Sequence, residues 1–144
     1  MSDTKTVKVE LKTTITNGEE RDSYELLTFG TLQHKGRSIY LRYDEVQQDL
    51  NKTHTIVKWS PEEVFIMRSG HVKMRQKFLK DLMTVGSFES TYGTMQMLTT
   101  AKKMNHSWDD NTKEGKIHLI YDLNMQGNDV GQYDMLIRYK EETK

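Results

Sequence analysis

The feature that most constrains this chain is an alternation of apolar and polar residues that recurs in nearly every segment. Near the N-terminus, Val7, Val9 and Leu11 alternate with lysine and glutamate. The stretches 117–125 and 133–139 alternate in the same way. A period of two places one set of side chains on one face of an extended strand. The sequence therefore predicts β-strands almost throughout and no long helix.

Short turn signals divide the chain into about nine or ten strands. A two-residue loop at Lys35-Gly36 would pair Leu32 with Ile39. The segment 79–85 is ambiguous and could hold a single helical turn. A sheet of so many strands exposes two edges unless it closes on itself. The predicted fold is therefore all-β: one domain over residues 1–144, forming a single antiparallel barrel of about 8–10 strands.

Composition excludes several classes of function. The chain has no cysteine, which rules out disulfides, thiolate metal sites and a cysteine nucleophile. Its 21 basic and 21 acidic residues cancel, so no overall field attracts nucleic acid or an anionic membrane. No apolar stretch approaches the roughly 18 residues that span a bilayer, and the N-terminus lacks a signal-like apolar region. A cytoplasmic location is expected.

Recognisable catalytic motifs are missing from the sequence. It contains no phosphate-binding glycine loop, nucleophile elbow or metalloprotease histidine pair. The five histidines fall in separate segments without metal-ligand spacing: His34, His54, His71, His106 and His118. We predict no catalytic residue, no metal and no cofactor, and an enzyme without a recognisable motif stays an open alternative.

Methionine and a few polar groups mark the predicted barrel interior. Six methionines lie in predicted strands, several on the inner face: Met67, Met74, Met95, Met97, Met125 and Met135. Thioethers adapt to varied apolar ligands, but they also fill irregular cores. Tyr43, Gln76 and Tyr121 share the inner face, so they are the candidates to orient a small apolar or amphipathic ligand. The main functional prediction is non-catalytic binding of a small molecule or partner in or around the barrel.

A basic hairpin at residues 68–80 supports an alternative function. Turning at Ser69-Gly70 would pair Phe65 with Met74, both predicted to be buried together with Leu119 and Ile137. The same register predicts an outer basic strip for RNA or anion binding: Arg68, His71, Lys73, Arg75 and Lys77. A solvated face paired with Glu62 or Glu63 explains the same charges without function.

Some apolar residues are predicted to face outward. They include Val64 and Ile66 on one hairpin and Leu27, Phe29 and Tyr40 on another. A homo-oligomer would cover such a surface.

The most specific run of sequence is MRSGHVKMRQKF, from Met67 to Phe78. It is preceded by TIVK at 55–58 and followed by TYG at 91–93 and GKI at 115–117. In these runs, and along nearly its whole length, the chain resembles the YwiB-like family of small, mainly Gram-positive bacterial proteins of unknown function. The resemblance implies a calycin, or lipocalin-like, β-barrel and no assigned activity.

Overall fold

The structure is a computed structural model that describes residues 4–46 and 51–142, and within them every regular element is a β-strand. The strands are β1 (Thr4–Asn17), β2 (Glu20–Lys35), β3 (Ser38–Val46), β4 (Lys52–Trp59), β5 (Val64–Gly70), β6 (Lys73–Phe78), β7 (Met83–Ser90), β8 (Gly93–Asp109), β9 (Glu114–Met125) and β10 (Asn128–Glu141). In these ranges no helix long and apolar enough to cross a membrane is present.

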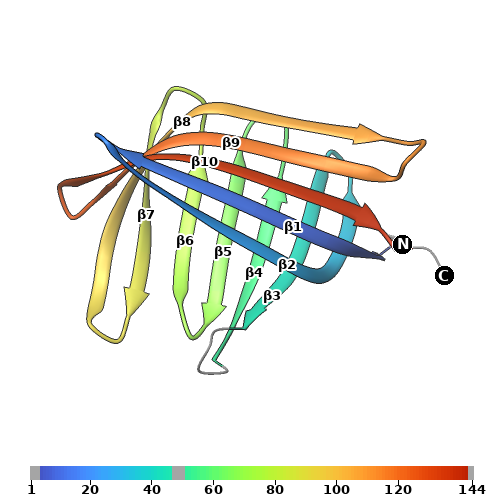
Figure 1. Cartoon of the computed structure of the whole chain (residues 1–144), viewed down its shortest axis with the longest axis horizontal. Coiled ribbons are helices and arrows are strands. Elements are labelled where there is room, and N and C mark those ends of the chain that lie inside the picture. The colour runs from blue at the N-terminus through green and yellow to red at the C-terminus, as the bar shows by residue number, and fades with distance from the viewer. Residues whose placement is uncertain (1–3, 47–50, 143–144) are drawn as a thin grey trace.

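The strands form a closed antiparallel barrel in which each strand pairs with its neighbours in sequence. β1 pairs with β10 and closes the sheet, and these two strands lie side by side in blue and red in Figure 1. Among the described strands, closure removes the two free edges that an open sheet would have. The predicted all-β barrel is confirmed. The ambiguous segment 79–85 contains no helical turn: a tight turn with Asp81 at φ 61° joins β6 to β7.

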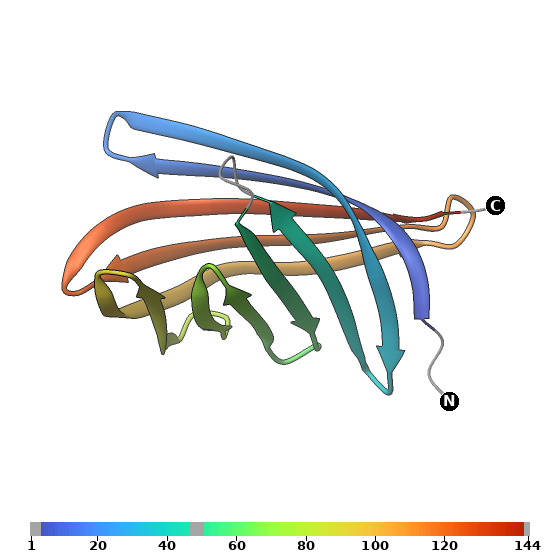
Figure 2. The same cartoon turned by 90° about the horizontal axis from the view of Figure 1, so that it is seen from below.

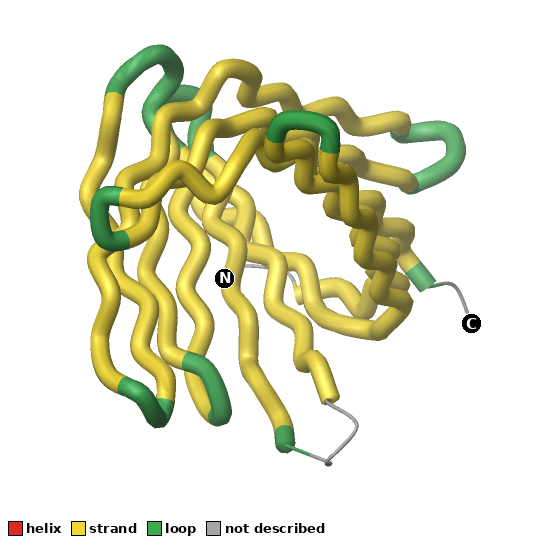
Figure 3. The backbone as a smooth tube through the Cα atoms, turned by 60° about the vertical axis from the view of Figure 1, so that its left-hand side comes forward, coloured by secondary structure: helices red, strands yellow, loops and turns green. Residues whose placement is uncertain are grey.

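The turns lie at opposite ends of the barrel, as an up-and-down order requires. Figure 2 shows the turns of β1–β2, β7–β8 and β9–β10 on the left and the β8–β9 turn on the right. Figure 3 shows the strands wrapped around a common axis. Part of the polar connection between β3 and β4, residues 47–50, lies outside the described residues.

The β2–β3 hairpin has a slightly different register from the predicted one. Its loop falls at Gly36-Arg37 instead of Lys35-Gly36, so Leu32 pairs with Leu41 and not with Ile39. The partner moves by two residues, and an even shift keeps every side chain on its predicted face.

The β5–β6 hairpin corrects the prediction more seriously. The structure pairs Phe65 with Lys77 and Arg68 with Met74, whereas a loop at Ser69-Gly70 would have paired Phe65 with Met74. The partner of Phe65 thus moves by three residues, from 74 to 77. An odd shift reverses the face on which one strand presents its side chains. Here β5 is reversed and β6 keeps its predicted orientation.

Gly70 explains why the turn comes later than the sequence suggested. It has φ 103°, and a Cβ there would lie 2.5 Å from the Lys52 carbonyl oxygen. The next residue, His71, donates its backbone N–H to the same oxygen at 3.1 Å. Glycine is therefore required by the close approach of β5 to β4, and the chain turns at His71-Val72.

The reversed orientation of β5 changes which of its residues belong to the core. Val64 and Ile66, predicted to face outward, are 0% and 4% exposed in the core, so neither needs cover from an oligomer. Phe65 is only partly buried on the outer face, and Met67 is 37% exposed beside it. Of the other residues predicted to be buried, Leu119 and Ile137 are fully buried, whereas Met74 is only partly buried.

Candidate functional site

The barrel interior has a packed half and a hollow half. Along β1, Val7 and Val9 are fully buried in the core, whereas Leu11 and Ile15 line a cavity. The same division runs along the other strands that cross both halves. The cavity has a volume of about 540 Å³ and lies toward the end that carries the β1–β2 and β9–β10 turns, on the left in Figure 2.

Methionine and aromatic side chains make most of the cavity wall apolar. Five methionines line it: Met74, Met95, Met97, Met125 and Met135. Phe88 and four tyrosines also border it. Met67, the sixth methionine assigned to a strand, lies outside because β5 is reversed. Unbranched thioethers can change rotamer to fit ligands of different shapes.

Tyr43, Gln76 and Tyr121 all line this cavity. The Gln76 amide donates a hydrogen bond from Nε2 to Thr99 Oγ1 at 3.0 Å, which fixes its orientation. Tyr121 stacks on Tyr133 with ring centroids 5.1 Å apart. Burial raises the pKa of the Tyr43 and Tyr121 phenols well above the ordinary value, so both keep their protons at neutral pH. Whether they contact a ligand stays a prediction.

An ion pair that the sequence did not reveal lies in the wall of the cavity. Arg68 Nη2 contacts Glu45 Oε2, and both side chains line the cavity. They are only 25% and 14% exposed. The outward assignment of Arg68 was wrong because β5 is reversed. The signal for Glu45 was present, since it lies two residues after the inward-facing Tyr43 on the same strand.

The predicted basic strip is consequently divided. Lys73, Arg75 and Lys77 lie on the outer face, with Lys77 paired to Glu63 at 3.3 Å. The Arg75 guanidinium lies 6.0 Å from the Phe65 ring centroid. His71 is exposed in the turn. Without Arg68, the outer strip contains fewer basic residues than predicted. Glu63 also balances the charge of Lys77.

Aromatic residues close the packed half. A Cβ on Gly115 would lie 2.0 Å from Tyr139 Cζ, so only glycine permits the tyrosine ring to lie there. The ring stacks near Trp108, at a centroid distance of 6.0 Å, and its hydroxyl lies 2.6 Å from His106 Nε2. Burial lowers the pKa of His106, and charge on His34 lowers it further. These rings therefore pack against one another at this end of the barrel.

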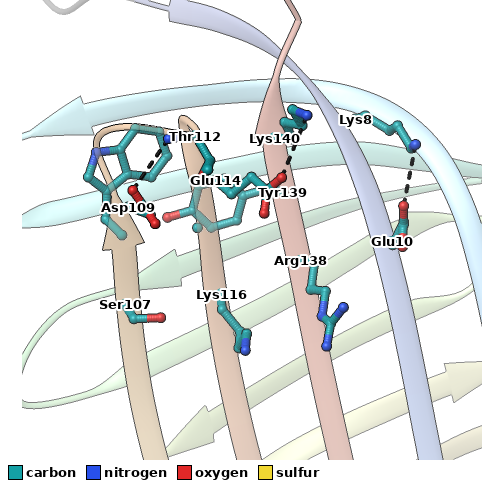
Figure 4. A pocket seen from close by; sticks show the side chains of 12 residues that line it. Lys8, Glu10, Ser107, Asp109, Thr112, Glu114, Lys116, Arg138, Tyr139 and Lys140 are labelled. Carbon is teal, nitrogen blue, oxygen red and sulfur yellow. Dashed lines mark hydrogen bonds and ion pairs between the residues drawn. The ribbon is translucent and has the colours of Figure 1, made fainter.

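A second hollow lies over the ends of β1, β8, β9 and β10 and measures about 650 Å³ (Figure 4). Charged side chains dominate its lining. Lys8 pairs with Glu10 at 3.4 Å and Lys140 with Glu114 at 3.6 Å, as the dashed lines show. These pairs lie on the outside of the sheet, where solvent weakens them. The internal cavity is therefore the better candidate for a specific site.

In the part of the chain that the structure describes, no group of three or more histidine, aspartate or glutamate side chains is arranged to hold a metal ion.

The fold and the cavity define a class: a small, closed, ten-stranded antiparallel β-barrel with an internal cavity that is mainly apolar and has a polar end. A family model described as "Domain of unknown function (DUF1934)" matches residues 9–137, and the chain belongs to this family. It is similar to the "Uncharacterized beta-barrel protein YwiB" of Bacillus subtilis (strain 168), with 31% identity over 134 residues, covering 93% of this chain and 92% of that protein.

A solved structure supports the same assignment. The crystal structure of the ywiB protein from Bacillus subtilis superimposes with a TM-score of 0.84 and 31% sequence identity. The match covers 97% of this chain and 94% of that chain. The predicted membership of the YwiB-like family is therefore confirmed.

Proposed function

We propose that this protein binds a small amphipathic molecule inside the barrel without converting it chemically. The observation that carries the proposal is the hollow half of the barrel. Its volume of about 540 Å³ is within the range of small-molecule sites, which is roughly 300–1,000 Å³. The space is open to solvent, since Tyr24 in its lining is 60% exposed, so a ligand has a route into it.

The lining supports an amphipathic ligand over a purely apolar one. Methionine and aromatic side chains offer a surface for a hydrocarbon part. Tyr43, Gln76 and Tyr121 add a few polar groups that would orient the molecule, as in most ligand sites.

Anion binding by the outer strip is the weaker alternative. Lys73 and Arg75 remain exposed, but Lys77 is paired with Glu63 and Arg68 lies inside. If the strip bound RNA, affinity for an oligonucleotide would fall steeply with salt, because each phosphate contact contributes about 0.7 to the log-log slope on single strands.

Native mass spectrometry of freshly purified protein tests the main proposal. We expect either a bound small molecule or uptake of added 1-octanol in a one-to-one complex. Met135→Trp, which places a large ring in the cavity, should abolish uptake. Met67→Trp makes the same change on the outer face and should preserve it. Equal uptake by the two variants, or none by the wild type, would overturn the proposal.

A further inference from the structure

Polar groups gather in one row across three neighbouring strands of the cavity wall. Tyr43 on β3 pairs with Thr55 on β4, which in turn pairs with Arg68 on β5. All three side chains line the cavity. Glu45 lies two residues beyond Tyr43 on the same face and contacts Arg68. The cavity thus has a polar end at β3–β5. Met74 lies beside Arg68, and the other four cavity methionines lie across the cavity on β8, β9 and β10.

Hydrogen-bond donors at this end exceed their protein acceptors. The Thr55 side chain is 2% exposed, and within the described residues its hydroxyl oxygen has no hydrogen-bond partner. Arg68 carries five N–H donors, and its contact with Glu45 is made through Nη2. Tyr43 keeps its phenolic proton because burial, and then the charge of Glu45, raises its pKa. A buried hydroxyl without a partner costs stability unless a ligand satisfies it.

The charge at this end is nevertheless balanced. Of the residues that line the cavity, two have acidic side chains or the basic side chains of lysine and arginine: Arg68 and Glu45. Their formal charges cancel. A carboxylate that entered the cavity would lose its hydration and would meet no net positive charge in return. An uncharged acceptor would satisfy the same donors at a much smaller desolvation cost.

We propose that the row formed by Tyr43, Thr55 and Arg68 binds the uncharged carbonyl head group of an amphipathic ligand, an amide, ester or ketone, and that Glu45 excludes carboxylates. This inference rests on the proposed function, because it specifies the ligand of the same cavity. The hydrocarbon part of the ligand lies toward the methionines.

Octanamide and octanoate provide a matched pair of probes. They share one chain and nearly the same head-group shape, and they differ in charge and in the N–H donors that only the amide carries. We expect isothermal titration calorimetry to show that the wild type binds octanamide at least about tenfold more tightly than octanoate. The free-energy cost of burying the uncompensated charge of octanoate exceeds the free energy that corresponds to a factor of ten in affinity.

Glu45→Gln gives the sharpest test because it preserves shape and removes one charge. Arg68 then has no counter-ion, so octanoate should gain at least about tenfold in affinity and become the preferred probe. Arg68→Met should weaken octanamide without improving octanoate. A thermal melt of each variant establishes that it is folded, and Glu45→Gln alone decides the question if Arg68→Met does not fold.

The outcomes separate this inference from the proposed function. If 1-octanol and both other probes fail to bind, both claims are overturned. If 1-octanol binds but the wild type prefers octanoate, or if Glu45→Gln leaves the preference unchanged, the cavity binds ligands and the head-group assignment is wrong.

Discussion

At the scale of single residues, two threonines on β4 make it possible to distinguish the effect of a buried hydroxyl on stability from its effect on ligand binding. Thr53 and Thr55 are both buried, and within the described residues neither hydroxyl has a hydrogen-bond partner. Only Thr55 lines the cavity. A polar residue that binds a ligand can lower the stability of the ligand-free protein, because its buried polar group has no hydrogen-bond partner until the ligand binds.

Valine substitutions at these two positions test that distinction. Thr55→Val and Thr53→Val should each raise the free energy of unfolding by about 1 kcal/mol, since each removes a buried, unsatisfied hydroxyl at nearly constant shape. Urea denaturation measures the change. Calorimetry should show that only Thr55→Val weakens octanamide binding. A loss of stability in Thr55→Val would mean that its hydroxyl is satisfied within the protein.

His106 makes stability depend on pH. Burial lowers its pKa in the folded state, with a further contribution from charge on His34. The unfolded chain therefore binds a proton more readily, so this contribution to stability is present above the unfolded pKa of about 6.5 and is lost as pH falls from there through the lower pKa of the folded state.

The prediction is a comparison between wild type and His106→Gln. From about pH 7.5 to about pH 5, the free energy of unfolding of the wild type should fall more than that of the variant. Urea titrations at several pH values measure both. Parallel curves would show that His106 titrates alike in the folded and unfolded states.

At the scale of elements, the register of the β5–β6 hairpin decides which residues form the core. Ile66 is 4% exposed and faces inward, whereas Phe65 lies on the outer face and is partly buried. Ile66→Ala should therefore cost about 2–4 kcal/mol of stability. Phe65→Ala should cost less, although it removes more atoms, because no enclosed cavity results. Denaturant unfolding of both variants gives the order, and the opposite order would indicate the register with a loop at Ser69-Gly70.

The same hairpin shows how far the sequence could predict the fold and the site. Alternation identified nearly every strand, and it placed Tyr43, Gln76 and Tyr121 on the inner face. It missed Arg68 because Gly70 resembles a turn residue. Glycine is needed at this position because the backbone of β5 passes close to the Lys52 carbonyl oxygen of β4. Local sequence does not encode this contact between strands. A side-chain period of two makes any odd error in loop position a complete reversal of the face.

At the scale of the whole molecule, one set of strands supplies both stability and a binding volume. β1 begins and β10 ends in the packed half, where the core residues of both strands are fully buried. The hollow half extends from this support toward the opposite turns. The division could not be read from the sequence, because alternation marks an inward side chain without telling whether the space beyond it is filled.

Methionine methyl groups report directly on the central claim that the cavity binds small molecules. Five methionines line the cavity, while Met67 and Met83 are exposed. In protein labelled with ¹³C at methionine methyls, NMR titration with 1-octanol should shift the resonances of Met74, Met95, Met97, Met125 and Met135. The resonances of Met67 and Met83 should stay in place. Shifts confined to these two exposed methionines, or no shifts at all, would contradict binding inside the barrel.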